Sequence, residues 1–397
     1  MSDELGVQSL FLLPMKSLPQ KLYKKIEMRK QQNSLRKLPR SISGVDFSSN
    51  DYLGFSALED LKVKSAALLS RYASKNGATG SRLLTGDHSL YWIAESLISE
   101  FHQMESALIF NSGYDANIGF FSSVPQKDDM ILYDEYIHAS IRDGIQMSHA
   151  RSWKFGHNDL GDLENKIQKV TSENAIIYVV TESIFSMDGD SPHLIPLTAC
   201  CEKYNCLLIV DEAHALGVMG AEGRGLVLER EIQDKVFASI VTFGKAMGGH
   251  GAAVLGSEDL KQYLVNFARS LIYTTGLPPH SVAGIVAAYE LLQLQNIHHE
   301  KLRDRIAFFK KMVKKNNLAS LFINSDSAIH CALIPGVETV KHIANELTVH
   351  GYQVKPILAP TVPKGKERLR FCLHSYNSEN EISEVLALLA TFVNNNL

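Results

Sequence analysis

The sequence predicts an α/β fold in which a mostly parallel sheet flanked by helices is followed by a smaller α+β region. Short apolar runs alternate with helical patterns through the middle of the chain, as in parallel sheets with crossover helices. Two runs, 175–181 and 207–210, are almost continuously apolar, which is typical of strands covered on both faces. The 397 residues, of which 45% are hydrophobic and 21% charged, are sufficient for a large core.

The chain begins with a polar, basic stretch, about residues 17–37, whose apolar positions Leu18, Leu22 and Ile26 recur at helical spacing and predict a helix. Further helical patterns, such as Tyr91–Phe101 and Ile195–Tyr204, lie between the apolar runs. The runs themselves are the expected strands of the main sheet: Ala107–Phe110, Met130–Tyr133, Ala175–Thr181, Leu207–Val210, Val236–Thr242 and Ala252–Leu255.

The character of the sequence changes after Pro278-Pro279. We expect a long helical segment from about Val282 to Lys315, then a strand at Arg368–Cys372 and a final helix at Glu379–Val393. This pattern predicts a large domain of residues 50–285 and a small C-terminal domain of residues 286–397. Residues 1–49 are expected to supply an N-terminal helix and an extension that pack with the small domain.

Charge and cysteine content exclude several classes of protein. The 40 Lys+Arg and 43 Asp+Glu give a net charge of −3, whereas nucleic-acid binding through phosphate contacts favours a basic excess. The five cysteines form no CxxC pair, so we expect reduced thiols and no metal site. No apolar run approaches the roughly 20 residues of a membrane span, and the patch Leu10–Pro14 lacks the basic segment of a secretory signal. We therefore expect a cytoplasmic protein without nucleic-acid or membrane partners.

The strongest functional signal is the tetrapeptide Asp-Glu-Ala-His at 211–214, directly after the apolar run 207–210. In open α/β sheets, ligands bind beyond the carboxyl ends of the strands, so an acid and a histidine there are well placed. The same tetrapeptide also resembles the magnesium-binding strand of helicase-type ATPases, which need a Gly-x-x-x-x-Gly-Lys-Ser/Thr loop. That loop is missing, because neither Gly-Lys pair, at 244–245 or at 365–366, is followed by a hydroxyl residue.

Lys245 is the second signal. It follows the apolar run 236–242 and has small residues on both sides, which permit a ligand to approach closely. A lysine in such a place can have a lowered pKa and form a Schiff base. Together with Asp211 it indicates pyridoxal phosphate, which needs an amine for the imine and a carboxylate for its pyridinium nitrogen. His214 could bond the phenolic oxygen of the ring, and the turn at 111–115 offers N–H donors for the phosphate.

These and further motifs resemble one known family, the α-oxoamine synthases, which are fold-type I pyridoxal-phosphate-dependent transferases. The resemblance covers the chain from about Arg36 to His374. It rests on six motifs in one order, which are Asp46–Gly54, Gly77–Arg82, Phe185–Asp190, Asp211–His214, Thr242–Lys245 and Tyr273–Pro279. Each motif is weak alone, but all six in this order are specific. The resemblance implies the fold-type I architecture and pyridoxal 5'-phosphate as the cofactor.

The resemblance also implies a role for each residue that matches a family motif. Lys245 corresponds to the Schiff-base lysine and general base, and His138 to the histidine that stacks on the cofactor ring and assists catalysis. Thr275 corresponds to a residue that reaches the phosphate from a second subunit, which implies a homodimer with shared active sites. The other implied cofactor contacts, to the ring nitrogen, the phenolic oxygen and the phosphate, fall on Asp211, His214, Ser186, Thr242, Gly113 and Tyr114.

On the substrate side, Arg370 matches the family arginine that binds the amino-acid carboxylate, for which a bidentate guanidinium pair is suited. Arg368 is the alternative, because alternation places both arginines on one face of the strand. Asn50 is expected to assist. Thr361 and Arg36 match positions near the acyl substrate in one subgroup of the family.

The implied activity is a decarboxylative condensation of an amino acid with an acyl thioester. The motifs are most similar to those of the 8-amino-7-oxononanoate synthases, which implies L-alanine, a pimeloyl thioester of coenzyme A or of an acyl-carrier protein, and biotin biosynthesis. Two departures, Ile-Leu-Ala at 357–359 and Asp87 in the motif 85–88, bear on the acyl chain more than on the chemistry. The alternatives are a sister synthase that uses glycine, such as a 2-amino-3-ketobutyrate ligase, or a longer acyl-CoA. A non-catalytic protein of this fold would be favoured by loss of Lys245 or Asp211, and both are present.

Overall fold

The computed structural model describes residues 18–36, 38, 43–73, 75–170, 174–294 and 296–396. They belong to two compact units, Met1–Ile42 and Ser43–Leu397. The first unit contains helix α1 (Gln20–Gln31), which has no buried side chain and is shorter than the predicted helix at 17–37. The apolar patch Leu10–Pro14 lies outside the described residues.

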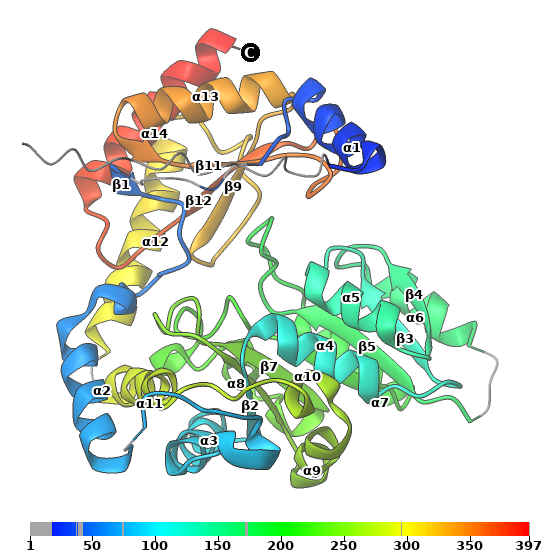
Figure 1. Cartoon of the computed structure of the whole chain (residues 1–397). Helices are drawn as coiled ribbons and strands as arrows, with labels where there is room; N and C mark the ends of the chain where they lie inside the picture. The colour runs from blue at the N-terminus through cyan, green and yellow to red at the C-terminus, as the bar shows by residue number, and fades with distance from the viewer. Residues whose placement is uncertain are drawn as a thin grey trace, which may run out of the picture. The chain divides into compact units, whose positions relative to one another are not determined.

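The main element of the second unit is a seven-stranded sheet (Figure 1). In spatial order its strands are β2 (Ser106–Phe110), β8 (Ala252–Gly256), β7 (Ala238–Thr242), β6 (Leu207–Asp211), β5 (Ile177–Glu182), β3 (Met130–Asp134) and β4 (Arg151–Phe155). Neighbouring strands from β7 to β4 are parallel, and β8 runs antiparallel to both β7 and β2. The mostly parallel sheet confirms the predicted fold class.

Strand β4 is the member of this sheet that the sequence did not predict. Its five residues, Arg-Ser-Trp-Lys-Phe, pair with β3 at the edge of the sheet and are mostly exposed. Because β4 lies at the edge of the sheet and most of its residues are exposed to solvent, it needs no apolar run. The other six strands coincide with the predicted apolar runs to within a few residues.

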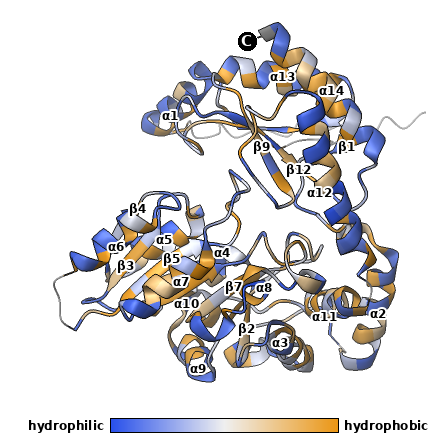
Figure 2. Ribbon diagram, turned by 180° about the vertical axis from the view of Figure 1, so that it is seen from behind, coloured by the Kyte–Doolittle hydropathy of each residue, from blue (hydrophilic) through white to orange (hydrophobic). Residues whose placement is uncertain are grey.

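The sheet separates two hydrophobic cores, because successive residues of a strand point to opposite faces. Val179 of β5 and Leu208 of β6 belong to one core, whereas the next residues, Val180 and Ile209, belong to the other. The strands β3 and β5 accordingly carry mostly hydrophobic colouring in Figure 2. This alternation explains why both faces of the strands must be apolar.

Helices cover both faces of the sheet. One core is shared with α4 (Gly113–Ser123), α5 (Ala139–Met147), α9 (Glu258–Phe267) and α10 (Arg269–Ile272). The other core is shared with α3 (Ser89–His102), α6 (Leu160–Gln168), α7 (Leu194–Lys203), α8 (Leu226–Glu229) and α11 (Pro279–Leu294). Helix α2 (Glu59–Tyr72) packs against α11. Short helical turns complete this part: η1 (Phe55–Ala57), η2 (Arg82–Gly86), η3 (Ala221–Gly223) and η4 (Gln233–Lys235).

The later part of the chain builds a separate antiparallel sheet in the order β11 (Lys355–Ile357), β12 (Arg368–Cys372) and β9 (Ile329–Leu333). A two-stranded parallel sheet pairs β1 (Val45–Asp46) with β10 (Tyr352–Gln353), so the segment before the large sheet joins the C-terminal part. The helices here are α12 (Ile297–Lys315), α13 (Val337–Val349) and α14 (Glu379–Asn396). The predicted strand Arg368–Cys372 is β12 and is buried at every residue.

The predicted helical segment from Val282 to Lys315 consists of two helices, because α11 ends at Leu294 and α12 begins at Ile297. The side chain of Asn296 lies 3.2 Å from those of His299 and Glu300 in the first turn of α12. In the part of the chain that the structure describes, no helix is both long and apolar enough to cross a membrane.

Candidate active site

Three polar side chains stand at adjacent strand ends of the seven-stranded sheet. Glu182 is the last residue of β5, Asp211 the last of β6 and Thr242 the last of β7. The strand registers pair Glu182 with Asp211 and Asp211 with Ile240, so these ends share one edge. Asp211 therefore lies where open α/β sheets bind their ligands.

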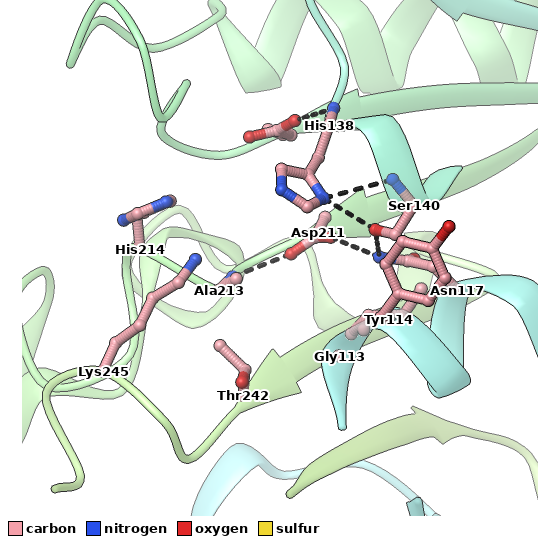
Figure 3. A pocket seen from close by; sticks show the side chains of 12 residues that line it. Gly113, Tyr114, Asn117, His138, Ser140, Asp211, Ala213, His214, Thr242 and Lys245 are labelled. Atoms are coloured by element: carbon pink, nitrogen blue, oxygen red, sulfur yellow. Dashed lines mark hydrogen bonds between the residues drawn. The ribbon is translucent and has the colours of Figure 1, made fainter. Parts of the chain in front are cut away.

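A cavity of about 190 Å³, which we call the first cavity, opens at this edge (Figure 3). Its walls come from the strand ends, from the starts of α4 and α5, and from the segments that follow β6 and β7. The lining residues are Gly113, Tyr114, Asn117, His138, Ser140, Glu182, Asp211, Ala213, His214, Ile240, Thr242 and Lys245. Seven of the predicted site residues are thus brought together from distant parts of the sequence.

The carboxylate of Asp211 is fixed by two N–H donors. The backbone N–H of Ala213 donates to Oδ1 over 2.9 Å, and Nδ2 of Asn117 donates to Oδ2 over 3.1 Å. Asn117 also donates to the hydroxyl of Ser140 over 3.0 Å. Asp211 is 6% exposed and forms no ion pair with any described residue. A buried carboxylate of this kind is suited to a positively charged ligand group.

Lys245 projects into the first cavity from the segment after β7 (Figure 3). Its amine forms no hydrogen bond and no ion pair with the described residues. Burial lowers the pKa of Lys245 to about 8, although the neighbouring carboxylates of Asp211 and Glu182 oppose the shift. A substantial part of the amine is therefore unprotonated at slightly alkaline pH, which is the form that acts as a nucleophile or base.

Two histidines border the first cavity. His138 caps the start of α5, with Nδ1 2.7 Å from the hydroxyl of Ser140, and its backbone N–H donates to the carboxyl group of Glu182. His214 has Nδ1 2.7 Å from the hydroxyl of Tyr52. Burial lowers the pKa of His138 and holds that of His214 well below its ordinary value. The low pKa of His214 favours a neutral ring at physiological pH.

A candidate anion site lies at the start of α4. Ser112 caps this helix, and its hydroxyl accepts the backbone N–H of Asp115 over 3.1 Å. The first N–H groups of a helix have no acceptor within the helix, so Gly113 and Tyr114 present donors to an anion. Thr242 adjoins this start, because a Cβ on Gly113 would lie 3.6 Å from its side chain.

A second cavity, of about 330 Å³, shares His138 with the first. Two predicted residues, Ser186 and Thr361, lie here and not in the first cavity. The remaining lining residues are Tyr136, Ile137, Ala139, Arg142, Met187, Asp188, Pro360, Val362, Pro363 and Arg368. The site therefore has two compartments that meet at the imidazole of His138.

Arg370 and Arg368 both lie buried on β12, but their guanidinium groups are engaged differently. Arg368 forms an ion pair with Asp188 and donates to the carbonyl oxygen of Met187 over 3.1 Å. Arg370 donates from Nη2 to Oδ1 of Asn50 over 3.0 Å, and its buried Nε has no partner among the described residues. Arg370 thus retains a donor for a carboxylate, which favours it over Arg368 for that role.

Four predicted residues line neither cavity: Thr275, Arg36, Asn50 and Arg370. Thr275 is exposed, and its carbonyl oxygen accepts a hydrogen bond of 2.7 Å from the side chain of Asn111. Arg36 is exposed and belongs to the first compact unit, beyond α1. The proposed contacts of Thr275 with a neighbouring subunit and of Arg36 with the acyl substrate stay predictions.

Several residues of the site were not predicted from the sequence. Asn117 lies four positions after Gly113 on α4, so helical spacing places both on one face. Glu182 is the first residue beyond the predicted strand at 175–181, and Tyr52 lies inside the motif 46–54. Their contacts to Asp211, His138 and His214 join residues far apart in the sequence, which no local pattern reveals.

The family model for class I and II aminotransferases matches residues 42–389 of the chain. The chain belongs to this family. An 8-amino-7-oxononanoate synthase from Emericella nidulans is 39% identical over 378 residues, which cover 88% of this chain and 90% of that protein. This similarity makes the chain a pyridoxal-phosphate-dependent acyltransferase of the 8-amino-7-oxononanoate synthase type.

Solved structures agree with this assignment. The 8-amino-7-oxononanoate synthase of Francisella tularensis superposes with a TM-score of 0.76 at 29% identity, covering 89% of this chain and 98% of that one. A serine palmitoyltransferase from S. paucimobilis, solved with a PLP–myriocin aldimine, reaches a TM-score of 0.86 at 23% identity, with 95% and 97% covered. At that identity the second likeness shows the fold alone. The predicted fold-type I architecture and the α-oxoamine synthase resemblance are confirmed.

The first cavity fits the cofactor of the family. Lys245 offers an amine without a protein partner, and Asp211 offers a buried carboxylate that lacks a cation. A protonated pyridine nitrogen satisfies that carboxylate, and the start of α4 suits a phosphate. The donor set therefore matches the aldehyde, the ring nitrogen and the phosphate of pyridoxal 5'-phosphate.

Proposed function

We propose that the protein condenses L-alanine with a pimeloyl thioester to give 8-amino-7-oxononanoate, carbon dioxide and a free thiol, as a step of biotin biosynthesis. The observation that carries the proposal is the pair of cavities that meet at His138. The first offers the groups for a cofactor, and the second has partly apolar walls that suit an acyl chain. The names of the Emericella and Francisella relatives support the choice of product.

Bound pyridoxal phosphate supplies an electron sink for the α-carbon of the amino acid. Lys245 would hold the cofactor at its aldehyde carbon and Asp211 at its ring nitrogen. Gly113, Tyr114 and Thr242 would hold the phosphate. We assign one face of the ring to His138, and the phenolic oxygen to His214 and Ser186. Lys245 and His138 are the proposed catalytic residues.

Lys245 is placed to act as the general base, because its lowered pKa of about 8 makes the neutral amine available. The amine takes the α-proton of alanine while Arg370, assisted by Asn50, holds the carboxylate. The α-carbon then bonds to the thioester carbonyl carbon, the C–S bond breaks, and the thiol leaves with a proton from solvent. Carbon dioxide departs next, and the lysine returns a proton to the α-carbon.

The second cavity is the proposed acyl site. Ile137, Met187 and Val362 give it apolar walls suited to a methylene chain. Arg142 lines the same cavity, is exposed, and donates to the carbonyl oxygen of Glu135. A guanidinium group has five N–H donors, so Arg142 retains donors for the terminal carboxylate of a pimeloyl chain. Thr361 borders the same compartment.

We also propose a homodimer. Leu84 is 80% exposed and Tyr273 is 73% exposed, which is unusual for large apolar side chains. Their segments lie side by side, because the N–H of Gly276 donates to the carbonyl of Gly80 over 3.0 Å. A second copy that covered this surface would bring Thr275 to a neighbouring phosphate site. Sedimentation of the purified protein tests the dimer.

The carrier of the acyl group is coenzyme A or an acyl-carrier protein, both of which bear phosphate. Arg36 and the mostly exposed basic side chains of α1 offer positive charge for either carrier. A cytoplasmic location belongs to the same proposal, and its support is that all five cysteines are free and buried. Small-molecule substrates alone suffice for the proposed reaction if coenzyme A is the carrier.

Thiol release tests the proposed function. Holoenzyme is supplied with alanine, glycine or serine and with the coenzyme A thioesters of pimelate, heptanoate, acetate or palmitate. We expect alanine and pimeloyl thioester to be the best pair, with 8-amino-7-oxononanoate identified by mass spectrometry. Turnover with glycine alone, or with palmitoyl thioester alone, would refute the proposal and favour a sister synthase.

A further inference from the structure

A chain of hydrogen bonds joins the amino-acid side of the site to its cofactor side through Tyr52. This tyrosine is 0% exposed, and its hydroxyl oxygen lies 2.7 Å from Nδ1 of His214 and 3.1 Å from Oδ1 of Asn50. The same Asn50 oxygen accepts a hydrogen bond of 3.0 Å from Arg370. Tyr52 therefore lies between two groups of residues. On one side are Arg370 and Asn50, which are proposed to bind the carboxylate of the amino acid, and on the other is His214, which is proposed to bind the cofactor.

The available protons decide the direction of this chain. A guanidinium group only donates, so Arg370 fixes the amide of Asn50 with its oxygen toward the network. Burial raises the pKa of Tyr52 well above its ordinary value, so the phenol keeps its single proton. If Tyr52 donated its proton to His214, its hydroxyl oxygen would lie 3.1 Å from the amide oxygen of Asn50, and neither atom would carry a proton for the contact.

The opposite arrangement satisfies these contacts, and it leaves the Tyr52 oxygen able to accept from the guanidinium group of Arg370 as well. Nδ1–H of His214 donates to the oxygen of Tyr52, whose hydroxyl donates to Asn50, which also accepts from Arg370. Nε2 of His214 is then left as an acceptor. Within the described residues Tyr52 is the sole hydrogen-bond partner of the His214 ring, so no other group can hold this tautomer.

We propose that Tyr52 is a positioning residue that orients His214 toward the cofactor and Asn50 toward the amino-acid carboxylate at the same time. This inference rests on the proposed amino-acid site. One hydroxyl group thus supports two binding sites, and its loss weakens both of them. If the role of Tyr52 were merely structural, its replacement would change the stability of the protein but neither binding site.

The test compares holoenzyme of the wild type with the variant Tyr52→Phe. Each is titrated with whichever of alanine, glycine and serine shifts the visible absorbance of the wild type, and cofactor loss during dialysis is then timed. We expect the amino-acid dissociation constant and the rate of cofactor loss each to rise about three- to tenfold, as for one hydrogen bond. An unchanged value for both quantities overturns the proposal.

A matched control is Tyr289→Phe. Tyr289 is also 0% exposed, and its hydroxyl lies 3.1 Å from the ring of His102, outside both cavities. We expect this variant to change the melting temperature about as much as Tyr52→Phe while leaving both binding measurements unchanged. Equal binding defects in the two tyrosine variants would mean that general loosening is the cause, and would overturn the proposal.

A double variant tests the path through Asn50. If Tyr52 acts through this amide, Tyr52→Phe should weaken amino-acid binding less in an Asn50→Ala background than in the wild type. Strictly additive effects would overturn the chain of contacts. None of these measurements uses an acyl thioester. A wild type that binds an amino acid but releases no thiol therefore contradicts the proposed function and leaves the result on Tyr52 intact.

Discussion

The two cavities share one wall at His138 but are built from different kinds of structure. In the first cavity, Asp211 and Thr242 end strands, whereas Gly113 and His138 stand at helix starts. The second cavity is lined largely by the loop segments 186–188 and 360–363. Strand ends and helix starts hold side chains rigidly, whereas loops tolerate change. If the proposed function is correct, the sheet positions the residues of the chemistry and the loops select the acyl chain.

The contacts that hold the two cavities also differ. Asp211 in the first is held by amide N–H donors, whereas the loops of the second are held by charged pairs. His157 lies 3.0 Å from Asp134 at the end of β3 and 2.9 Å from Asp190, and the ring of Tyr136 stacks on it at 4.3 Å. The shape of the second cavity should therefore depend on pH more strongly than that of the first.

The largest effect is expected from Lys245→Ala in the first cavity. Loss of the amine removes both the attachment of the cofactor and the general base, and the base alone is worth about 10²- to 10⁴-fold in rate. We expect turnover and the visible absorbance of the holoenzyme to disappear together. Thiol release and an absorption spectrum of the purified variant are sufficient measurements.

The second Gly-Lys pair provides the control. Lys366→Ala removes an exposed lysine that also follows a glycine, but on the loop before β12. We expect absorbance and turnover of this variant to match the wild type. A Lys245→Ala protein that still turned over at the wild-type rate would refute the assignment.

The next effect compares two adjacent carboxyl groups, those of Asp211 and Glu212. Asp211 faces the cavity, whereas Glu212 accepts the backbone N–H groups of Leu226 and Val227 over 2.6 and 3.0 Å, and burial raises its pKa to about 7. We expect Asp211→Asn to lower kcat by about 10²- to 10³-fold without unfolding the protein. Glu212→Gln should lower the melting temperature and spare kcat. Equal losses of kcat would show that Asp211 has no special role.

The sequence predicted much of the first cavity because its residues follow buried strands. Apolar runs marked β6 and β7, so Asp211 at the end of β6 and Lys245 three residues beyond β7 could be named without a structure. The break between α11 and α12 could not be predicted, because no proline or glycine marks it. Local patterns thus identify elements and their ends, but not a break within a continuous helical pattern.

The second cavity and the supporting residues were much less predictable. Asn117 reaches Asp211 across 94 positions, and Tyr52 reaches His214 across 162 positions. Ser186 was expected beside the cofactor but lines the second cavity with Thr361. Such contacts depend on how loops and helices pack over the sheet, so they follow from tertiary structure and not from a motif.

The third prediction concerns His157 and the loops of the second cavity. Burial opposes its charge, but hydrogen bonds with Asp134 and Asp190 raise the pKa of His157 to about 10 from 6.5. A raised folded-state pKa stabilises the protein fully below pH 6.5, and this stability is lost as pH rises through 10. We expect His157→Gln to cost about 2 to 5 kcal/mol at pH 6.

The difference in unfolding free energy between wild type and His157→Gln should therefore shrink steadily between pH 6.5 and 10. Urea unfolding at a series of pH values measures it. The exposed His149→Gln serves as the control and should show no such trend. A constant difference at all pH values would mean that the bridge to Asp134 and Asp190 carries no charge.

The smallest effect is expected from Arg142→Gln, which removes a cation that forms no ion pair with a described residue and leaves the apolar walls of the second cavity intact. Because an exposed ion pair is worth about 0.2 to 1 kcal/mol, we expect KM for pimeloyl thioester to rise only about two- to fivefold. Heptanoyl thioester, which has the same chain length without the carboxylate, should be unaffected, as should the visible absorbance. Equal changes for both thioesters would mean that Arg142 shapes the loop and does not recognise the acyl carboxylate. A changed absorbance would contradict the separation of the two cavities, since it would mean that a residue of the second cavity alters the cofactor in the first.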